Sequence, residues 1–284
     1  LVVHHVTAAV TRDGEIAYRQ RVVGQSIMAG TPFQAMIKEG VDPTAIEGNA
    51  PEQYDLEHAH VSWTQAHSPV TVLWWRSVGH THMAFSKEVM IDELAQAAGE
   101  DPVAFRLRHL GKHPRHATAL KLAAEKAGWD QPFAKGPGRG RGVAVHESFG
   151  TVVAEIAEVT VKGDQITVDR VVCAVDCGVA VTPDVVRAQM QSGIGYGLSA
   201  ALLGKITLTD GHVDQTNFHQ YQVLRINQMP KNIEVYIVPS GNAPSGVGEP
   251  GTPPIAPAVA NAVRAATGVR LRTLPFDLAA ARKA

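Results

Sequence analysis

The amino-acid sequence predicts an α+β fold with two lobes, and three patterns indicate it. Runs of β-branched residues flank turn residues at two places, helical periodicity follows each of them, and a glycine-rich segment separates the two halves. The expected lobes cover residues 1–135 and 141–284. A chain of 284 residues is long enough to bury a substantial core, and no internal repeat is visible.

The first lobe is expected to begin with β-strands. Residues 2–10 and 15–23 flank an Arg-Asp-Gly turn, which is typical of a hairpin. Residues 30–56 are rich in loop-forming residues. Residues 57–75 alternate again, and they predict a strand that ends in the segment VTVLWWR and enters a glycine-containing loop.

Three helices are expected after this strand. Residues 83–98 place apolar side chains on one stripe, and Gly99 suits the position that follows the last helical residue. Asp101 is expected to cap the next helix, with Pro102 in its first turn. A third helical segment covers about 116–127.

A glycine-rich segment marks the boundary between the lobes. Residues 136–142 read GPGRGRG, a composition that predicts a connector without regular structure. An arginine–glycine segment can also contact nucleic acid, but so short a segment favours a connector. Residues 150–161 and 165–175 then predict a second hairpin, and Thr182 followed by Pro183 predicts a capped helix start.

The rest of the second lobe is expected to alternate between helices and strands. The helix is expected to continue to about Leu203, and strands are expected near 205–209 and 232–238. A loop rich in glycine and proline covers 240–257, and a helix follows at about 257–266.

The composition of the chain argues against some classes of binding partner. The formal net charge is −1, so no electrostatic attraction to nucleic acid or an anionic membrane is expected. No apolar run is long enough for a transmembrane helix. Cys173 and Cys177 lie in an apolar stretch without zinc spacing, which favours buried thiols. The chain begins within an expected strand, which suggests a processed product or one piece of a longer polypeptide.

The segment 244–254, PSGVGEPGTPP, is the strongest candidate for a functional site. It places Glu249 between glycines and prolines, directly before an alanine-rich helix. Glycine permits a close backbone approach and proline removes local freedom, so one carboxylate is held rigidly at a loop tip. Taken alone, Glu249 would more simply be a solvated turn residue near a helix N-terminus.

Four segments in order resemble the molybdopterin-binding subunits of the xanthine oxidase family, in their C-terminal portion. From the N-terminus, they are the WWRSVGH loop at 74–80, the helix pair at 83–110, the Asp-x-Gly strand end with the Gln- and Gly-rich helix at 175–197, and the 244–254 segment with the LRTLPF ending. The WWRSVGH form is most similar to the branch of the isoquinoline 1-oxidoreductase beta subunit, which also includes membrane-associated aldehyde dehydrogenases. The resemblance implies the two-lobed molybdenum-cofactor-binding fold of that family.

The resemblance also implies a role for particular residues. Glu249 matches the general base of the family, and Gln189 matches a glutamine that hydrogen-bonds the molybdopterin. Trp75 and Arg76 match loop residues whose backbone lies near the metal, and Gly248 is expected to bring the backbone close to the cofactor. No side chain of this chain is expected to ligate a metal.

The family resemblance further implies cofactors and partners. The cofactor is expected to be molybdenum–molybdopterin, in its cytosine dinucleotide form. The family's Met-Gly-Gln-Gly loop and its Gly/Ser-rich pterin loop do not occur in the sequence, so an upstream half or a companion molybdopterin-binding chain is expected to supply them. Because the chain lacks a cysteine set for an iron–sulfur cluster, a small subunit with two 2Fe–2S clusters is expected to take the electrons, with a cytochrome c as a further acceptor.

The expected function is therefore part of a molybdenum hydroxylase. It would oxidise an aldehyde or N-heteroaromatic C–H bond, with water as the oxygen source and Glu249 as the base. The alternative is a non-catalytic structural or assembly subunit that retains the fold without the cofactor. The periplasm or the periplasmic face of the membrane is favoured over the cytoplasm, by resemblance to an exported branch.

Histidine and aromatic residues give weaker signals. His80 lies in the loop that the resemblance places near the metal, and it is expected to approach the substrate. The other histidines, including His58 and His60, fit surface or core positions better than metal ligation. An aromatic heterocycle or an aldehyde could enter through a funnel lined by Trp63, Trp74, Trp75 and Phe85; for Trp63 and Trp74, packing in the core fits at least as well.

Overall fold

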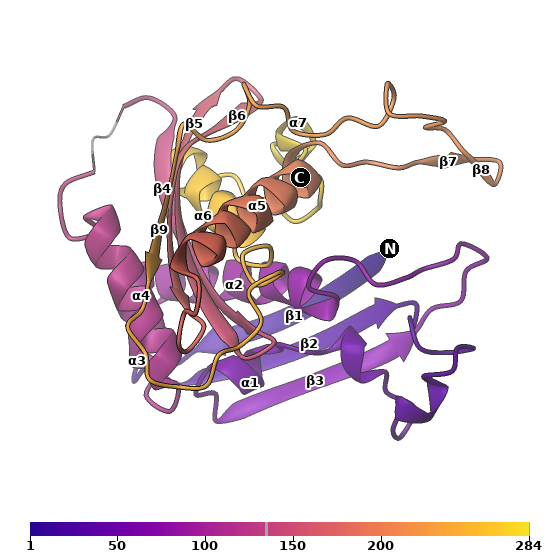
Figure 1. The fold of residues 1–284 in the computed structure, drawn as a ribbon, viewed down its shortest axis with the longest axis horizontal. Helices are drawn as coiled ribbons and strands as arrows, with labels where there is room; N and C mark the ends of the chain where they lie inside the picture. Colours follow the sequence, from indigo (N-terminus) through magenta and orange to yellow (C-terminus); the bar gives the residue numbers. More distant parts are fainter. Residues whose placement is uncertain (134–135, 284) are drawn as a thin grey trace.

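The computed structural model describes residues 1–133 and 136–283 and shows two larger sheets, with helices packed between and around them, and one two-stranded sheet (Figure 1). The mixed α and β composition that the sequence predicted is confirmed. Residues 134 and 135, where the first predicted lobe ends, lie outside the described residues. None of the helices in the described ranges combines the length and hydropathy that crossing a membrane requires.

The first sheet has the order β1-β2-β3. The hairpin of β1 (Val2–Val10) and β2 (Ile16–Gly24) is antiparallel, as the Asp-Gly turn predicted. β3 (His58–Gln65) lies parallel to β2, with Ala17 opposite His58 and Gly24 opposite Gln65. Side chains of β2 alternate between buried and exposed, so one face of this sheet is covered.

The strand expected over residues 57–75 is only partly present. β3 ends at Gln65, and residues 70–76 form loop and turn instead of strand. The reason is register: the last partner of β3 is Gly24, where β2 also ends, so the backbone beyond that point has no ladder to join. The prediction of a strand up to Arg76 was wrong.

The second sheet has the order β4-β5-β6-β9. β4 (Arg139–Ser148), β5 (Thr151–Lys162) and β6 (Gln165–Asp176) form an antiparallel meander, and β9 (Asn232–Ile237) lies parallel to β6. The hairpin of β5 and β6 was predicted. Two-residue strands β7 (Leu208–Thr209) and β8 (His212–Val213) form an arm that projects from the body, where a longer strand was expected (Figure 1).

The second part of the glycine-rich connector is instead the beginning of β4, which starts at Arg139, whereas residues 136–138 form loop and turn as predicted. Gly140 and Gly142 lie against the helix α6 (Ile255–Thr267): a Cβ at Gly140 would come within 2.2 Å of Ala262 O. The glycines therefore serve a close approach of strand and helix rather than flexibility. The prediction that this segment has no regular structure was therefore wrong for residues 139–142.

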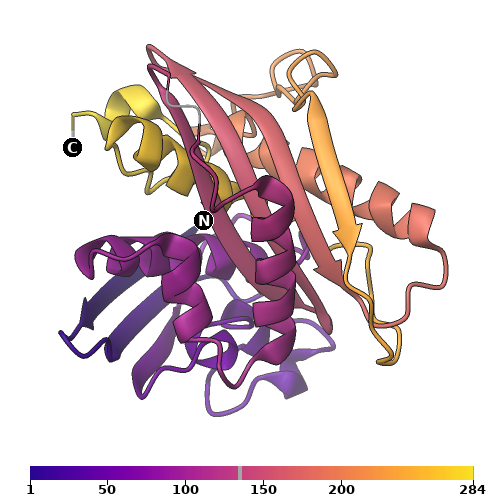
Figure 2. The ribbon, with the colours of Figure 1, turned by 90° about the vertical axis from the view of Figure 1, so that its left-hand side faces the viewer.

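Helices cover both faces of the second sheet. α4 (Pro114–Ala127) lies on one face, and α5 (Pro183–Leu202) with α6 lies on the other (Figure 2). α2 (Gly79–Ala97) packs between the two sheets, and α3 (Pro102–Arg108) follows it. The short helices α1 and α7 cover Ala50–Gln53 and Leu278–Ala281.

Local helix signals proved mostly accurate. The Asp101 side chain accepts hydrogen bonds from the backbone N–H groups of Val103 and Ala104, so it caps α3 as predicted. Thr182 precedes α5 as predicted, but its side chain makes no capping hydrogen bond, so that part of the prediction was wrong. Cys173 and Cys177 are free and buried, as expected.

Two apolar cores lie on the two faces of the second sheet. One joins β5 and β6 to α5 and α6, and the other joins the same strands to α2, α3, α4 and β2. The second core draws on residues from both sides of the 136–142 segment. The division of the chain into two lobes stays a prediction.

Candidate functional site

The loop that carries Glu249 is fixed by hydrogen bonds to the ends of β5 and β6. Ser245 donates its backbone N–H to Cys177 O at 2.9 Å. The Thr151 hydroxyl donates to Gly246 O at 2.7 Å. Because these bonds hold the backbone and prolines restrict it further, the position of the loop is determined by the second sheet.

Glu249 itself lies where this loop meets a segment from the first half of the chain. Its backbone carbonyl accepts a hydrogen bond from Thr252 N at 2.9 Å and another from the Ser77 hydroxyl at 2.9 Å. Ser77 is fully buried, whereas Glu249 is half-buried. The carboxylate is thus carried on a residue whose backbone carbonyl accepts two hydrogen bonds.

Arg76 joins three segments that are distant in the sequence. Its Nε donates to Gly248 O at 3.0 Å, and its Nη2 also donates to that oxygen. The same guanidinium donates to Gln189 Oε1 at 3.4 Å and to Ser192 Oγ at 3.3 Å. The structure therefore brings together Arg76, Gln189 and Gly248, three residues that the sequence singled out.

An aromatic residue that the sequence reasoning missed completes this group. The Tyr196 ring lies 4.9 Å from the Trp75 ring, and the Arg76 guanidinium lies 5.4 Å from its centroid. A signal was available: Gln189, Ser192 and Tyr196 are spaced to share one face of a helix. Trp75 is 40% exposed and Tyr196 is 43% exposed, so the aromatic pair forms an open surface next to Arg76.

The 75–79 loop has an unusual backbone. Ser77 and Val78 adopt positive φ angles of 66° and 51°, which are rare for residues with a side chain and especially for a β-branched valine. Gly79 permits a close approach, because a Cβ there would lie 1.8 Å from Thr44 O. Its backbone N–H donates to Glu47 Oε1 at 2.8 Å. Strained backbone of this kind persists only where surrounding contacts hold it, and it is frequent at functional sites.

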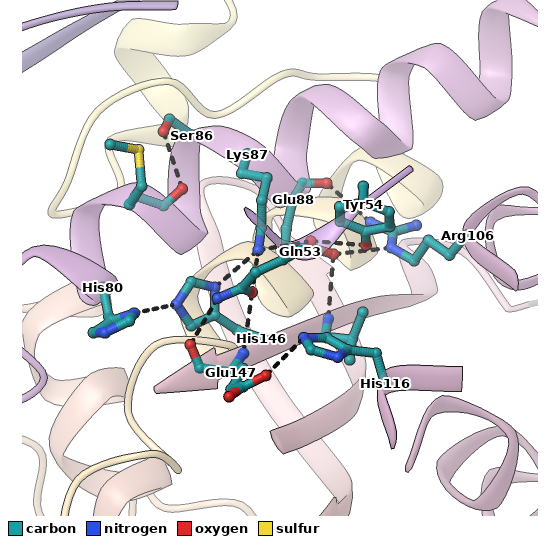
Figure 3. A network of polar contacts seen from close by, with 12 residues as sticks. Gln53, Tyr54, His80, Ser86, Lys87, Glu88, Arg106, His116, His146 and Glu147 are labelled. Carbon is teal, nitrogen blue, oxygen red and sulfur yellow. Dashed lines mark hydrogen bonds and ion pairs between the residues drawn. The ribbon is translucent and has the colours of Figure 1, made fainter. Parts of the chain in front are cut away.

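His80 is directed into the protein. Its Nδ1 lies 3.0 Å from His146 Nε2 (Figure 3). Its ring also packs against Phe149. Burial and the charge of nearby Lys87 lower the pKa of His80 to about 4, so the imidazole is neutral at ordinary pH. That His80 approaches the substrate stays a prediction.

A buried polar network continues from His146, and the sequence reasoning missed it (Figure 3). The fully buried Lys87 ammonium contacts Gln53 Oε1 at 2.6 Å and His146 Nδ1 at 3.0 Å. It also lies 3.8 Å from Glu88 Oε1, whose other oxygen is 2.9 Å from Arg106 Nε. Burial lowers the pKa of Lys87 to about 8, although Glu88 acts in the opposite direction. Such buried charges are tolerated because each has a partner.

A cavity of about 270 Å³ lies next to the 75–79 loop. Of the four aromatic residues considered for a substrate funnel, Trp63 and Trp75 line it. Trp74 instead packs edge-on against Phe33, and Phe85 packs against the core. The 75–79 loop thus lines this cavity and also carries Arg76, which with Gln189, Ser192, Tyr196 and Gly248 forms what we call the Arg76 group.

Within residues 1–133 and 136–283, no group of three or more His, Cys, Asp or Glu side chains is arranged to hold a metal ion. The polar groups of the site are instead an arginine, an amide and backbone carbonyls. They suit hydrogen bonding to an organic group better than coordination of an ion.

Comparison with known proteins identifies the family. Residues 57–230 match the family model described as "Molybdopterin cofactor-binding domain". The chain is 36% identical over 232 residues to the beta chain of isoquinoline 1-oxidoreductase from Brevundimonas diminuta, covering 81% of this chain and 30% of that protein. It is 34% identical over 271 residues to one of the subunits of nicotinate dehydrogenase from Pseudomonas putida, covering 89% and 22%. The chain therefore spans less than a third of these relatives.

Solved structures agree with this fold. Quinoline 2-oxidoreductase from Pseudomonas putida 86 matches with a TM-score of 0.77 and 14% identity, over 96% of this chain and 60% of that chain. Reconstituted CO dehydrogenase from Oligotropha carboxidovorans matches with a TM-score of 0.80 and 13% identity, over 99% and 61%. With the family model covering most of its length, the chain belongs to the molybdopterin cofactor-binding domains of the xanthine oxidase family.

Proposed function

We propose that this chain forms the part of a molybdenum hydroxylase that supplies its general base, Glu249. The reaction would be the oxidation of an aldehyde or N-heteroaromatic C–H bond, with water as the oxygen source. The observation that carries the proposal is the Arg76 group: one guanidinium binds Gln189 and Gly248, and Gly248 directly precedes Glu249. Two residues with expected cofactor contacts are thereby linked to the expected base.

The residues of this group fit a molybdopterin. Arg76 supplies a permanent cation, Gln189 supplies an amide, and both are only half-buried. A Cβ added at Gly248 would meet open space among the described residues, so the loop backbone is uncovered on that side. A cation, an amide and bare backbone together suit a planar hydrogen-bonding ring system with phosphate attached.

Glu249 would act as the proton acceptor. When bound, the cofactor supplies the redox chemistry, in which the substrate loses two electrons and gains an oxygen atom derived from water. The Glu249 carboxylate accepts the proton that this oxygen loses, which requires an approach to about 3 Å. Because Ser77 and Thr252 hold the Glu249 carbonyl, the backbone that carries the carboxylate needs little reorganisation.

The test is Glu249→Gln in the complete enzyme. The substitution preserves size and hydrogen bonding but removes the base, so turnover is expected to fall by about 10²–10⁴-fold at unchanged molybdenum content. Glu57→Gln, at an exposed position, is the matched control and is expected to leave turnover unchanged. Turnover of the Glu249→Gln enzyme at the level of this control, with molybdenum present, would refute the role.

The remaining parts of the enzyme are proposals of the same kind. The open aromatic pair of Trp75 and Tyr196 suits contact with an upstream half or a companion chain that completes the cofactor site. The pterin would carry cytosine dinucleotide, a small iron–sulfur subunit would accept the electrons, and a cytochrome c would follow. The complete assembly is proposed to lie in the periplasm or at its membrane face. A native assembly without molybdenum would favour the structural-subunit alternative.

A further inference from the structure

A chain of polar side chains leads from the interior to the 75–79 loop. We call Lys87, His146, His80 and Glu47 the polar chain. Lys87 and His146 are joined at 3.0 Å, and His146 and His80 are joined at 3.0 Å (Figure 3). His80 Nε2 lies 3.9 Å from Glu47 Oε2. The polar chain connects the first half of α2 with β4 and with the loop before α1.

The direction of its hydrogen bonds is fixed by Lys87. An ammonium can only donate, so His146 Nδ1 must accept and His146 Nε2 must carry the ring proton. His146 Nε2 then donates to His80 Nδ1, and the ring proton of His80 lies on Nε2, on the side of Glu47. Each neutral imidazole thus has one defined tautomer and one defined orientation.

The far end of the polar chain holds the strained loop. Glu47 accepts the Gly79 N–H at 2.8 Å, and His80 lies in the first turn of α2. In the same turn the Thr81 hydroxyl donates to Arg76 O at 2.8 Å. α2 has no side-chain cap at Val78, so these bonds hold the start of the helix.

Gly48 adds a steric restraint to the same place. It has a φ of 72°, and a Cβ there would lie 2.4 Å from His80 Nδ1 and 2.7 Å from His146 Nε2. The backbone at Gly48 therefore packs directly against both imidazoles. The pair has little room to tilt without moving the loop that carries Glu47.

We infer that Lys87 and His146 are positioning residues for Arg76, acting through His80 and the first turn of α2. Two consecutive residues in a strained conformation, Ser77 and Val78, need surrounding contacts to persist. The polar chain supplies those contacts from the helix side, and Ser77 supplies one from the Glu249 side. Without the polar chain, the loop can relax, and the Arg76 guanidinium can lose its hydrogen bonds to Gln189 and Gly248.

The first experiment measures the loop directly, by hydrogen–deuterium exchange of the complete holoenzyme. In His146→Leu and in Lys87→Met, amides of residues 75–81 are expected to exchange about tenfold faster, the effect of losing one well-formed hydrogen bond. His109→Leu removes another buried histidine, whose ring packs at a tilt against Phe105 of α3, and it is expected to leave this exchange unchanged. This readout requires no activity, so it separates the inference from the proposed function on which its catalytic consequence rests.

Two conservative variants distinguish positioning from general packing. His146→Gln keeps a donor near the Nε2 position, whereas His146→Asn keeps only an acceptor near the Nδ1 position. Slow exchange is expected in the glutamine variant and fast exchange in the asparagine variant. This pair carries the test if the leucine variant does not fold. Equal exchange in the two amide variants would overturn the inference.

A double-mutant cycle tests whether the effect passes through Arg76. Arg76→Lys keeps the positive charge but removes the planar guanidinium, which can donate several hydrogen bonds at once. If His146 acts through this guanidinium, His146→Leu lowers kcat/KM by about 10–100-fold in the native background and has little further effect in the Arg76→Lys background. If the losses of His146→Leu and Arg76→Lys multiply instead, the inference is overturned. The control His109→Leu is expected to have the same small effect on kcat/KM in both backgrounds.

Discussion

Gly142 offers a direct test of the close packing between β4 and the helix that follows the Glu249 loop. A Cβ added at this position would lie 2.2 Å from Ala262 N and 2.4 Å from Ala258 O. Both are backbone atoms, so no side-chain rotation can relieve the contact. Ordinary contact distances require the helix α6 and the strand to separate by roughly 1 Å.

The expected cost of Gly142→Ala follows from this geometry. Gly142 does not have a positive φ, so alanine adds no backbone strain and the effect is steric. Overpacking of this kind costs about 1–3 kcal/mol of unfolding free energy. The 244–254 loop leads directly into α6, so the same movement displaces Glu249. A displacement of about 1 Å in a catalytic group can lower the rate about 10²-fold.

The assay compares the holoenzyme carrying Gly142→Ala with one carrying Gly241→Ala. Gly241 lies close to the Glu249 loop, and a Cβ there meets open space. Gly142→Ala is expected to lower the melting temperature by several degrees and kcat/KM by at least tenfold, while Gly241→Ala changes neither. If both variants melt and turn over alike, the close packing does not fix the position of Glu249.

Three further predictions concern buried ionisable residues. Burial lowers the pKa of His4 and His80 to about 4, so between pH 6.5 and 4 the unfolded chain binds more protons than the folded one. The free energy of unfolding, measured in urea, should therefore decrease as the pH is lowered from 6.5 to 4, by up to about 1.4 kcal/mol per pH unit for each histidine. An unfolding free energy that does not change over this range would contradict the prediction. Arg106→Met leaves Glu88 buried without its 2.9 Å partner and should cost about 3–5 kcal/mol in urea unfolding, whereas the exposed Arg108→Met should cost under about 1 kcal/mol. Glu155 is fully buried and both of its carboxyl oxygens lack a partner among the described residues, so Glu155→Leu should raise the unfolding free energy by about 1–3 kcal/mol; a loss would mean that the carboxyl is satisfied.

Local patterns in the sequence determined most of the elements. The hairpins, the Asp101 cap and the Pro183 start of α5 depend on residues within a few positions of one another, so turn chemistry and periodicity predicted them. The 244–254 segment was recognisable for the same reason, because its glycines and prolines restrict the backbone wherever it folds. Family membership likewise rested on short motifs in order.

Only the tertiary structure decided what these segments meet. The 70–76 segment does not become a strand because β2 has already ended, and the glycines at 140 and 142 serve α6, which is more than 100 residues later in the chain. The Arg76 bond to Gly248 spans 172 residues, and the Lys87 contact with His146 spans 59. Partners at such separations leave no periodic signal, since any polar residue brought to the same place could have satisfied the same buried group.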